Sequence, residues 1–304
     1  MNPIEIAGIN EGPVAFAGDA GYILGGDRNK IRRWQVNDGK EVGQPMDGGD
    51  YVSSISVSRD GKWIVGGTGS GQVAVWNAES HNKVSKFKGH DRWVFAVDMS
   101  PDTTKIASGS DDWTVRVWLR STGEQLLGSL KHNHHVAAVK FSPDGQFITT
   151  ATWERKSVRV YDSRDGHLIF DILIEVSSPY NRSLAWVSDS KQLFALSRDG
   201  KVHCLDVPTG RILSAWTIHG NDNPRCIALG SNGAFIAASG KSSVSFWDTA
   251  TLKQIGPLIR LPNDAVHMAI SANDDLVFSG GNKIILWTLP DILPASFFDR
   301  VGVF

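Results

Sequence analysis

Cysteine is scarce in this chain of 304 residues, which has only two, and a charge excess and long apolar segments are also lacking. The 31 basic and 32 acidic side chains leave a net charge of −1, so no global field attracts duplex nucleic acid or an anionic membrane. No run approaches the roughly 20 apolar residues of a membrane span, and the start MNPIEIAG lacks the regions of a signal peptide. We therefore expect a cytoplasmic or nuclear protein with no membrane partner, for which nucleic acid is a poor candidate ligand.

The two cysteines, Cys204 and Cys226, lie in expected strands of adjacent repeats. In a chain without a signal sequence, buried thiols usually fill the core, and a disulfide between them is the alternative. We expect core packing.

Motifs that would mark a catalytic or cofactor site are absent. The sequence has neither His-Glu-x-x-His nor Gly-x-Ser-x-Gly. His132, His134 and His135 are close in sequence, but a strand turns neighbouring side chains to opposite faces and no cysteine or carboxylate stands at ligand spacing. The stretches 66–71 and 239–242 superficially resemble phosphate loops, yet neither lies between a strand and a helix. We expect no metal, no cofactor and no catalytic centre.

One unit stands out, residues 89–118, with the sequence GHDRWVFAVDMSPDTTKIASGSDDWTVRVW. Three short apolar runs are separated by two tight turns, Ser100–Asp102 and Asp111–Asp112, and a fourth run follows at Gln125–Leu130. Proline and aspartate suit such turns because proline presets φ and aspartate bonds locally to the backbone. No segment before residue 290 shows a helical period, and the third runs are almost continuously apolar, as in strands buried on both faces.

The unit recurs along the whole chain. Aligned on the residue that closes the third run, the copies are about 42 residues apart, the period of a four-stranded blade. The closing residues are Trp34, Trp76, Trp118, Tyr161, Leu205, Trp247 and Trp287. Seven copies over residues 1–289 predict one closed repeat domain, because a repeat array spreads its core over neighbouring units, and residues 290–304 form an apolar C-terminal tail.

The unit resembles a blade of the WD-repeat (beta-transducin-like) β-propeller family. The resemblance implies an all-β fold, a seven-bladed β-propeller of four-stranded antiparallel blades. In that family the N-terminal strand commonly supplies the missing outer strand of the last blade. We therefore expect Ile4–Ala7 to pair beside Lys283–Trp287 and to close the ring, which removes two exposed sheet edges.

Two places depart from the pattern. Arg33 stands where the other blades have an apolar residue or cysteine, at a position that should face the neighbouring blade. Because a buried charge is costly unless it is paired, we expect a local carboxylate there, with an opening to a partner as the alternative. The tail carries six large apolar residues, Ile292, Leu293, Phe297, Phe298, Val301 and Phe304. We expect it to pack on the underside of the propeller, with docking on a neighbouring domain as the alternative.

Blade three contains a set of polar residues with a known role in similar blades. In WD-repeat blades that resemble it, a histidine before the blade, a serine on the second strand, an aspartate in the next turn and the closing tryptophan form a hydrogen-bonded chain. The matching residues are His90, Ser108, Asp112 and Trp118. A catalytic triad is defined by geometry and not by such spacing. We interpret the set as a structural network, because buried polar groups require partners.

Candidate binding residues fall on the loops that lead into the blades and on the turns between second and third strands, which should gather on one rim. Blades two to four supply Tyr51, Trp93, Trp113, His134 and Trp153, and blades five and six supply Arg182, Arg198, Arg225 and Lys241. Tryptophan, tyrosine and arginine dominate binding hot spots.

We interpret the chain as a non-catalytic protein-interaction scaffold, monomeric as an isolated domain. It would hold a peptide or protein loop across the upper face, with an acidic or phosphorylated part over blades five and six. A glycan-binding propeller is one alternative, and it predicts similar pockets in every blade. Hydrolysis in the channel or a cleft is another, and it needs clustered carboxylates with perturbed pKa values.

Overall fold

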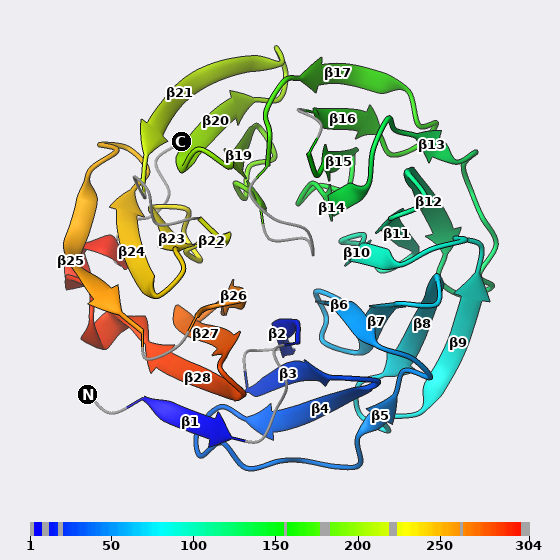
Figure 1. Ribbon diagram of the computed structural model, residues 1–304, viewed down its shortest axis with the longest axis horizontal. Coiled ribbons are helices and arrows are strands. Elements are labelled where there is room, and N and C mark those ends of the chain that lie inside the picture. The colour runs from blue at the N-terminus through cyan, green and yellow to red at the C-terminus, as the bar shows by residue number, and fades with distance from the viewer. Residues whose placement is uncertain are drawn as a thin grey trace.

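The computed structural model describes residues 3–7, 12–17, 21–154, 157–176, 183–218, 224–261 and 264–298. The described strands form seven antiparallel sheets of four strands each, which stand as blades around a central axis (Figure 1). In each blade from one to six, the four strands follow one another in sequence from the axis to the circumference (Figure 1). The predicted seven-bladed β-propeller is confirmed.

The strands of the first four blades lie between residues 14 and 172. Blade one contains β2 (Val14–Ala17), β3 (Tyr22–Asp27), β4 (Lys30–Gln35) and β5 (Met46–Asp47). Blade two contains β6 (Val52–Val57), β7 (Trp63–Thr68), β8 (Gln72–Asn77) and β9 (Lys83–Lys88). Blade three contains β10 (Val94–Met99), β11 (Lys105–Ser110), β12 (Thr114–Leu119) and β13 (Leu130–Lys131). Blade four contains β14 (Val136–Phe141), β15 (Phe147–Thr152), β16 (Val158–Asp162) and β17 (Leu168–Ile172).

The last three blades include the strand nearest the N-terminus. Blade five contains β18 (Leu184–Trp186), β19 (Gln192–Leu196), β20 (Lys201–Asp206) and β21 (Arg211–Thr217). Blade six contains β22 (Cys226–Leu229), β23 (Phe235–Ser239), β24 (Ser243–Asp248) and β25 (Gln254–Arg260). Blade seven contains β26 (His267–Ile270), β27 (Asp275–Gly280), β28 (Lys283–Thr288) and β1 (Ile4–Ala7). Two short 3-10 helices follow, η1 (Leu289–Asp291) and η2 (Ala295–Phe297).

The register explains the regular spacing of the closing residues. In every blade the closing residue pairs with an aliphatic residue of the second strand. The pairs are Ile23–Trp34, Ile64–Trp76, Ile106–Trp118, Ile148–Tyr161, Leu193–Leu205, Ile236–Trp247 and Leu276–Trp287. One strand geometry is therefore used seven times, with the closing side chain varied.

The ring closes as expected. β1 pairs with β28 from Ile4 opposite Leu286 to Ala7 opposite Lys283, and Figure 1 shows β1 outside β28 at the circumference of blade seven. Ile6 is buried in a cluster with Ile23 and Ile284. The predicted closure by the N-terminal strand is confirmed.

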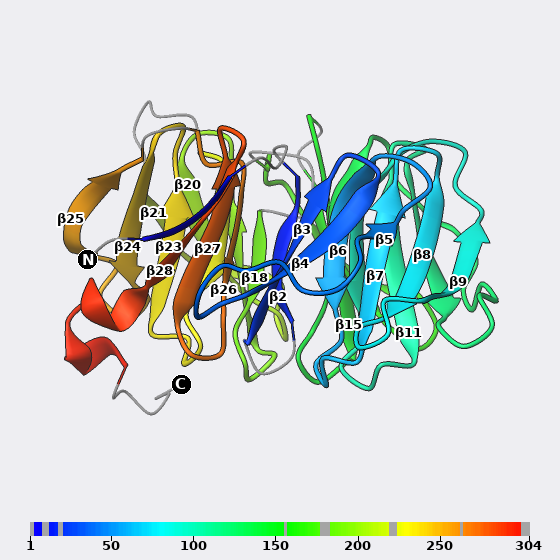
Figure 2. The same ribbon diagram turned by 90° about the horizontal axis from the view of Figure 1, so that it is seen from below.

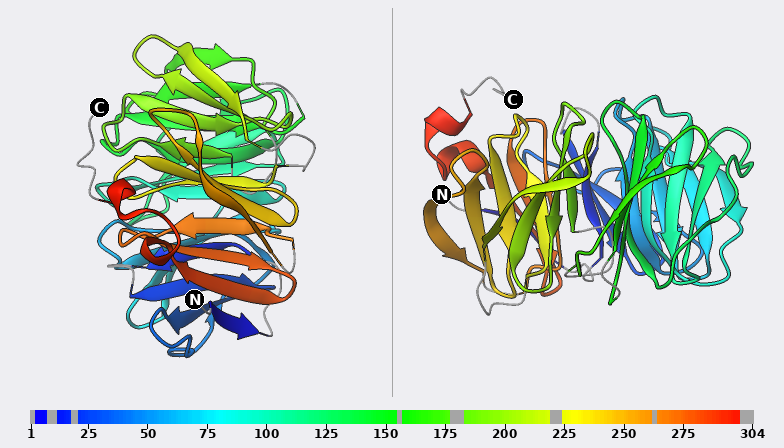
Figure 3. Two further views of the ribbon diagram at one scale, coloured as in Figure 1. Left: turned by 90° about the vertical axis from the view of Figure 1, so that its left-hand side faces the viewer. Right: turned by 90° about the horizontal axis from the view of Figure 1, so that it is seen from above.

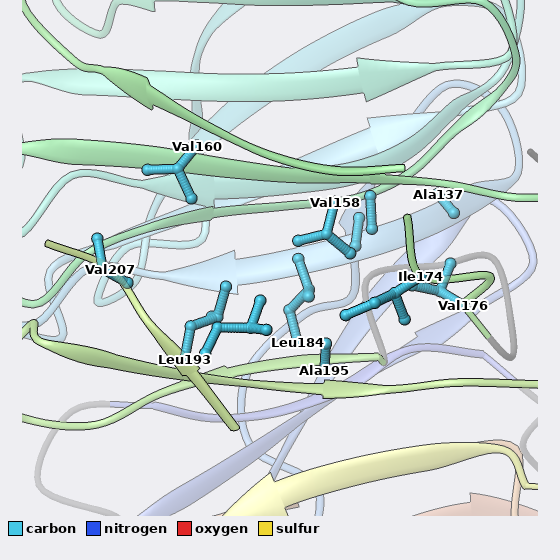
Figure 4. Packing of buried hydrophobic residues seen from close by; sticks show 12 residues of the cluster. Ala137, Val158, Val160, Ile174, Val176, Leu184, Leu193, Ala195 and Val207 are labelled. Carbon is cyan, nitrogen blue, oxygen red and sulfur yellow. The ribbon is translucent and has the colours of Figure 1, made fainter. Parts of the chain in front are cut away.

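The core lies between the blades. At the junction of blades four and five, Val158 and Val160 of β16 face Leu193 and Ala195 of β19, as Figure 4 shows, and all four are fully buried. The third strands are apolar because both of their faces meet neighbouring side chains in this way. Burial of a valine or leucine side chain stabilises the folded state by about 1.5–3 kcal/mol.

The fourth strand of blade three differs from its prediction. Only Leu130–Lys131 forms a ladder with β12, and Gln125 makes a single bridge to Trp118. The expected run at Gln125–Leu130 is thus shorter and later. The backbone N–H of Leu126 donates to the carbonyl oxygen of Val117 at 2.8 Å, and the side-chain amide of Gln125 donates to the carbonyl oxygen of Leu127 at 2.6 Å.

Arg33 faces blade two as expected, but the prediction of a carboxylate partner is wrong. Its Nη1 donates to the carbonyl oxygen of Ala78 at 2.6 Å, and its guanidinium lies 4.6 Å from the ring centre of Tyr22. No ion pair joins Arg33 to any carboxylate of the described residues. A carbonyl and an aromatic face stabilise the cation here, since arginine is weakly hydrated and stacks well on rings.

The described part of the tail packs on the underside of blades six and seven. Leu289 and Leu293 are buried against their core, and the ring of Phe298 meets that of Phe235 edge to face at 5.9 Å. The carbonyl oxygen of Phe297 accepts a 2.7 Å hydrogen bond from the side chain of Asn232. Figures 2 and 3 show this segment against one face of the ring. The expected packing is confirmed for residues 289–298, while Val301 and Phe304 lie outside the described residues.

Both cysteines are free and buried, as expected for core residues. Burial, with a smaller effect from Asp206, raises the pKa of Cys204 to about 11. No helix among the described residues has the length and apolar character needed to span a membrane.

Candidate functional site

The polar residues of blade three form one continuous hydrogen-bonded chain. The indole nitrogen of Trp118 donates to Ser108 Oγ at 2.8 Å, Ser108 Oγ lies 2.7 Å from His90 Nε2, and His90 Nδ1 lies 2.8 Å from Asp112. A carboxylate only accepts and an indole only donates, so a neutral His90 donates through Nδ1 and accepts through Nε2. Ser108 is fully buried and His90 almost so. The geometry supports a structural network, because substrate has no access to the serine.

The carboxylate end of this network is held ionised. Burial alone would raise the pKa of Asp112, but hydrogen bonds from His90 and Thr114 outweigh burial and keep the pKa well below its usual value. Thr114 donates to the same carboxylate through its hydroxyl at 2.6 Å and its backbone N–H at 3.0 Å. The carboxylate therefore joins the turn between β11 and β12 to the loop that precedes β10.

Blade four contains a second histidine network that sequence reasoning missed. His132 Nε2 lies 3.4 Å from Thr150 Oγ1 and 3.3 Å from the hydroxyl of Tyr161, and Nη1 of Arg159 lies 3.5 Å from its Nδ1. Burial, assisted by the charge of Arg159, lowers the pKa of His132 to about 3. Thr150 and Tyr161 replace the serine and tryptophan of blade three. The alignment of His132 with His90 was the available signal.

The three histidines near residue 132 have separate partners. His134 lies 3.6 Å from Glu154, and His135 is bonded to Asp111. Among the described residues, no group of three potential ligands could hold a metal ion. The two glycine-containing stretches that resemble phosphate loops lie at hairpins. Residues 66–68 end β7 and residues 69–71 turn into β8, while Ser239 ends β23 and residues 240–242 turn into β24.

The axial channel has a volume of about 440 Å3. Asp98 is the one carboxylate among the described residues that line it. Its oxygens accept hydrogen bonds from the hydroxyl of Ser56 at 3.1 Å and the backbone N–H of Phe141 at 2.8 Å, and Lys140 lies 3.6 Å away. The described channel lining therefore lacks the clustered carboxylates that the hydrolytic alternative predicts.

The loop that leads into a blade (the leading loop) is bonded to the turn between its second and third strands (the upper turn). Asp111 N–H donates to the Trp93 carbonyl at 2.8 Å, Trp153 N–H to His135 at 3.0 Å, and Gly69 N–H to Tyr51 at 2.9 Å. These segments form the upper rim, which is the upper edge in Figure 2. Tyr51, Trp93, Trp113, His134 and Trp153 all lie on it.

These side chains form a continuous aromatic run over blades two to four. Tyr51 meets Trp93 with ring centres 5.6 Å apart, and Trp93 meets Phe95 at 6.4 Å. Phe95 in turn meets His135 at 6.4 Å. His135 also contacts Trp113, His134 and Trp153, with ring centres 4.3–6.4 Å apart. Phe95 and His135 join the predicted residues, and sequence reasoning did not select them.

Trp113 is unusual within the run. Its backbone has φ of +68°, a conformation that costs a side-chain-bearing residue about 1–2 kcal/mol. Blades two and five place Gly71 and Gly200 at the equivalent turn position, each with its N–H bonded to the residue three earlier. Trp113 is 46% exposed, and its ring stacks on His134 at 5.9 Å. Packing alone does not account for a tryptophan here.

The basic residues of blades five and six are partly neutralised. Nη1 of Arg198 lies 3.2 Å from Glu175, and Nη2 of Arg225 lies 3.6 Å from Asp264. Lys241 is exposed, and no carboxylate of the described residues pairs with it. Arg182 lies outside the described residues.

A protein-family model matches three segments of the chain. The model described as "WD domain, G-beta repeat" matches residues 42–77, 81–118 and 124–162. Blades two to four are WD repeats. The matches fall on the segments that end with the closing residues of blades two, three and four, where the aromatic run and both histidine networks lie.

Two similar proteins extend the comparison. This chain is 22% identical over 286 residues to autophagy-related protein 16 of Arabidopsis thaliana. The aligned residues cover 91% of this chain and 47% of that protein. The chain thus spans about half the length of this curated relative. A chain in the crystal structure of the mitotic checkpoint complex matches with a TM-score of 0.82 at 18% identity, covering 94% of both chains. At this identity the likeness shows the fold alone. WD-repeat propellers typically mediate protein interactions and are generally scaffolds that lack enzyme activity.

Proposed function

We propose that this WD-repeat propeller is a non-catalytic scaffold that holds an extended peptide or a protein loop across its upper rim. The observation that carries the proposal is Trp113. This large side chain is 46% exposed on a left-handed backbone, where glycine would relieve the strain. Strained residues that surrounding structure retains cluster at binding sites.

The neighbours of Trp113 support an anchoring role. Tyr51 and Trp93 are 36% and 40% exposed on the same aromatic run. Exposed tryptophan and tyrosine supply large contact areas at small entropic cost, and such residues carry most of the binding energy of an interface. The structural neighbour from a checkpoint complex is itself part of a protein assembly, which also favours protein partners.

The charged sector of the rim fits an acidic or phosphorylated part of the partner. Lys241 is exposed, and the side chain of Arg198 is 64% exposed beside Glu175. A phosphate carries more charge than a carboxylate and accepts forked hydrogen bonds from arginine. It would therefore compete with Glu175 and Asp264 for Arg198 and Arg225 better than an acidic side chain would.

Affinity capture from cells that express the chain tests the proposal. We expect Trp113→Gly to release partners that the unaltered chain retains, and each identified partner, once purified, to bind this variant about 30-fold more weakly. Val84→Ala is the matched control, because Val84 is an exposed apolar residue on β9, an outer strand. Arg198→Glu combined with Arg225→Glu tests the charged sector. Full retention of every partner by both Trp113→Gly and the double arginine variant would overturn the proposal.

A further inference from the structure

An aromatic ring and a carboxylate lie close together on the upper rim between blades two and three. Both pack against Gly69, in the upper turn of blade two. A methyl group at Gly69 would lie only 3.3 Å from the indole of Trp93 and 3.4 Å from Oδ2 of Asp50. The lack of a side chain at Gly69 therefore lets Trp93 and Asp50 approach each other, and Tyr51 packs against Trp93 at 5.6 Å.

The carboxylate is oriented toward Gly69 and Trp93 by the backbone. Oδ1 of Asp50 accepts the backbone N–H of Tyr51 at 2.7 Å. Its other oxygen, Oδ2, is the one that faces Gly69. Asp50 is only half-buried, and Trp93 is 40% exposed, so a side chain from solution reaches both groups.

The described part of the surrounding rim has more carboxylates than lysine or arginine side chains. It comprises the leading loops 48–51, 89–93 and 132–135 and the upper turns 69–71, 111–113 and 153–154. Within these described segments the carboxylates are Asp50, Asp91, Asp111, Asp112 and Glu154, and Arg92 is the one lysine or arginine. Arg92 itself lies 3.6 Å from Asp111. Arg155 and Lys156 continue the last turn outside the described residues.

An aromatic face beside a carboxylate is suited to a cation. The ring attracts the charge through its quadrupole, and the carboxylate accepts N–H donors at the edge. The protein uses such contacts internally, since the guanidinium of Arg120 lies 4.1 Å from the ring centre of Trp63. An acidic or phosphate-bearing group would meet repulsion from Asp50 and Asp91 here.

We propose that the exposed face of Trp93 and the carboxylate of Asp50 together bind an arginine or lysine side chain of the partner, so that the segment over blades two and three is basic. This inference rests on the proposed function, because it assigns one subsite of the proposed peptide surface. It also gives the partner a polarity, with basic residues over blades two and three and acidic or phosphorylated residues over blades five and six.

Selection of random nonapeptides displayed on phage against the whole chain tests the subsite. Peptides that no longer bind Trp93→Ala or Gly69→Ala are expected to share an arginine or lysine. Replacing that residue by citrulline or norleucine, which remove the charge, should weaken binding about tenfold in fluorescence anisotropy. Asp50→Asn should weaken binding by a similar factor, and added salt should weaken it further.

The control is Asp165→Asn, at the turn between β16 and β17. Its carboxylate also accepts a backbone N–H, from His167 at 2.8 Å, so the two substitutions are matched locally. Binding should not change in this variant. Gly69→Ala alters no charge, and its thermal melting curve shows whether the fold is retained.

Two outcomes would overturn the inference. One is that the Trp93-dependent peptides share a neutral or acidic residue, and the other is that no selected peptide depends on Trp93. If selected peptides depend on Trp113 or Arg198 but not on Asp50 and Gly69, the basic subsite fails and the proposed scaffold function stands. If none depends on any rim residue, both fail.

Discussion

Blades three and four are adjacent and have the same strand arrangement, yet their histidines form hydrogen bonds in opposite directions. In blade three, His90 donates to the ionised Asp112. In blade four, Nη1 of Arg159 lies where it donates to His132 Nδ1, so a neutral His132 donates through Nε2 to Thr150 or Tyr161. One blade orders its histidine with a carboxylate and the other with a guanidinium.

This difference shows what the carboxylate contributes. His90 lies 2.7 Å from Ser108 and 2.8 Å from Asp112, whereas the polar contacts of His132 are all 3.3–3.5 Å. Hydrogen bonds to charged groups are shorter and roughly twice as strong as neutral ones. We conclude that the shorter hydrogen bonds of the polar network contribute more to the stability of blade three than the longer ones contribute to that of blade four.

The largest expected effect comes from removing each histidine. His90→Leu leaves Asp112 and Ser108 without their buried partner, and we expect the free energy of unfolding to fall by about 3 kcal/mol. His132→Leu removes long bonds and adds apolar surface to the core, so we expect a fall of about 1 kcal/mol. Urea unfolding of the two variants at pH 7 measures both. Equal losses would contradict the distinction between the blades.

A pH titration gives the next largest effect. The pKa of His132 is about 3 in the folded chain, against about 6.5 in the unfolded chain. Between these values the unfolded chain takes up a proton that the folded chain does not, so stability falls as the pH falls. From pH 7 to pH 5 we expect His132 to account for a loss of about 2 kcal/mol.

His132→Leu is the reference for this titration, because it lacks the group and should lose about 2 kcal/mol less over the same interval. Asp112 affects the free energy of unfolding over another pH range. Its pKa is lowered by folding, so its contribution is present above the usual aspartate value and is lost only as the pH falls below that value. A difference between variant and parent that appears only below pH 4 would contradict the role of His132.

The smallest effect concerns the left-handed residues of the two upper turns, Trp113 with φ of +68° and Glu154 with φ of +66°. Glycine relieves this strain, so Trp113→Gly and Glu154→Gly should each raise the free energy of unfolding by up to about 1 kcal/mol. Thermal unfolding measures this gain. A loss of more than about 1 kcal/mol in Trp113→Gly alone would show that stacking on His134 outweighs the strain.

The fold was predictable because the period is carried by residues that the fold itself requires. Each closing residue pairs with an aliphatic residue in the same register, so alignment on Trp76, Trp118 and Tyr161 located the blades. The polar residues of blade three matched their family positions one by one. The fourth strand of blade three was harder to place, since its outer position leaves little apolar pattern.

The remaining features depend on contacts between residues far apart in sequence. The sequence did not show that Thr150 and Tyr161 replace serine and tryptophan around His132. The family pattern is defined by residue type, and it does not include other residues whose hydroxyl groups can form the same hydrogen bonds. A carbonyl partner for Arg33 left no signal, since any residue supplies one. The left-handed backbone of Trp113 could not be recognised from tryptophan itself, which rarely adopts it. The one indication was that Gly71 and Gly200 occupy the same turn position in other blades.

The pairing of β1 with β28 sets an order of events during synthesis. Lys283 and Glu5, which form a 2.7 Å ion pair across this seam, are separated by 278 positions. Contacts of such long range form late, because the chain between them loses much entropy when its ends meet. β1 is synthesised before the other strands of the ring and yet is among the last to pair, so the nascent ring has an open gap until Thr288 has been translated.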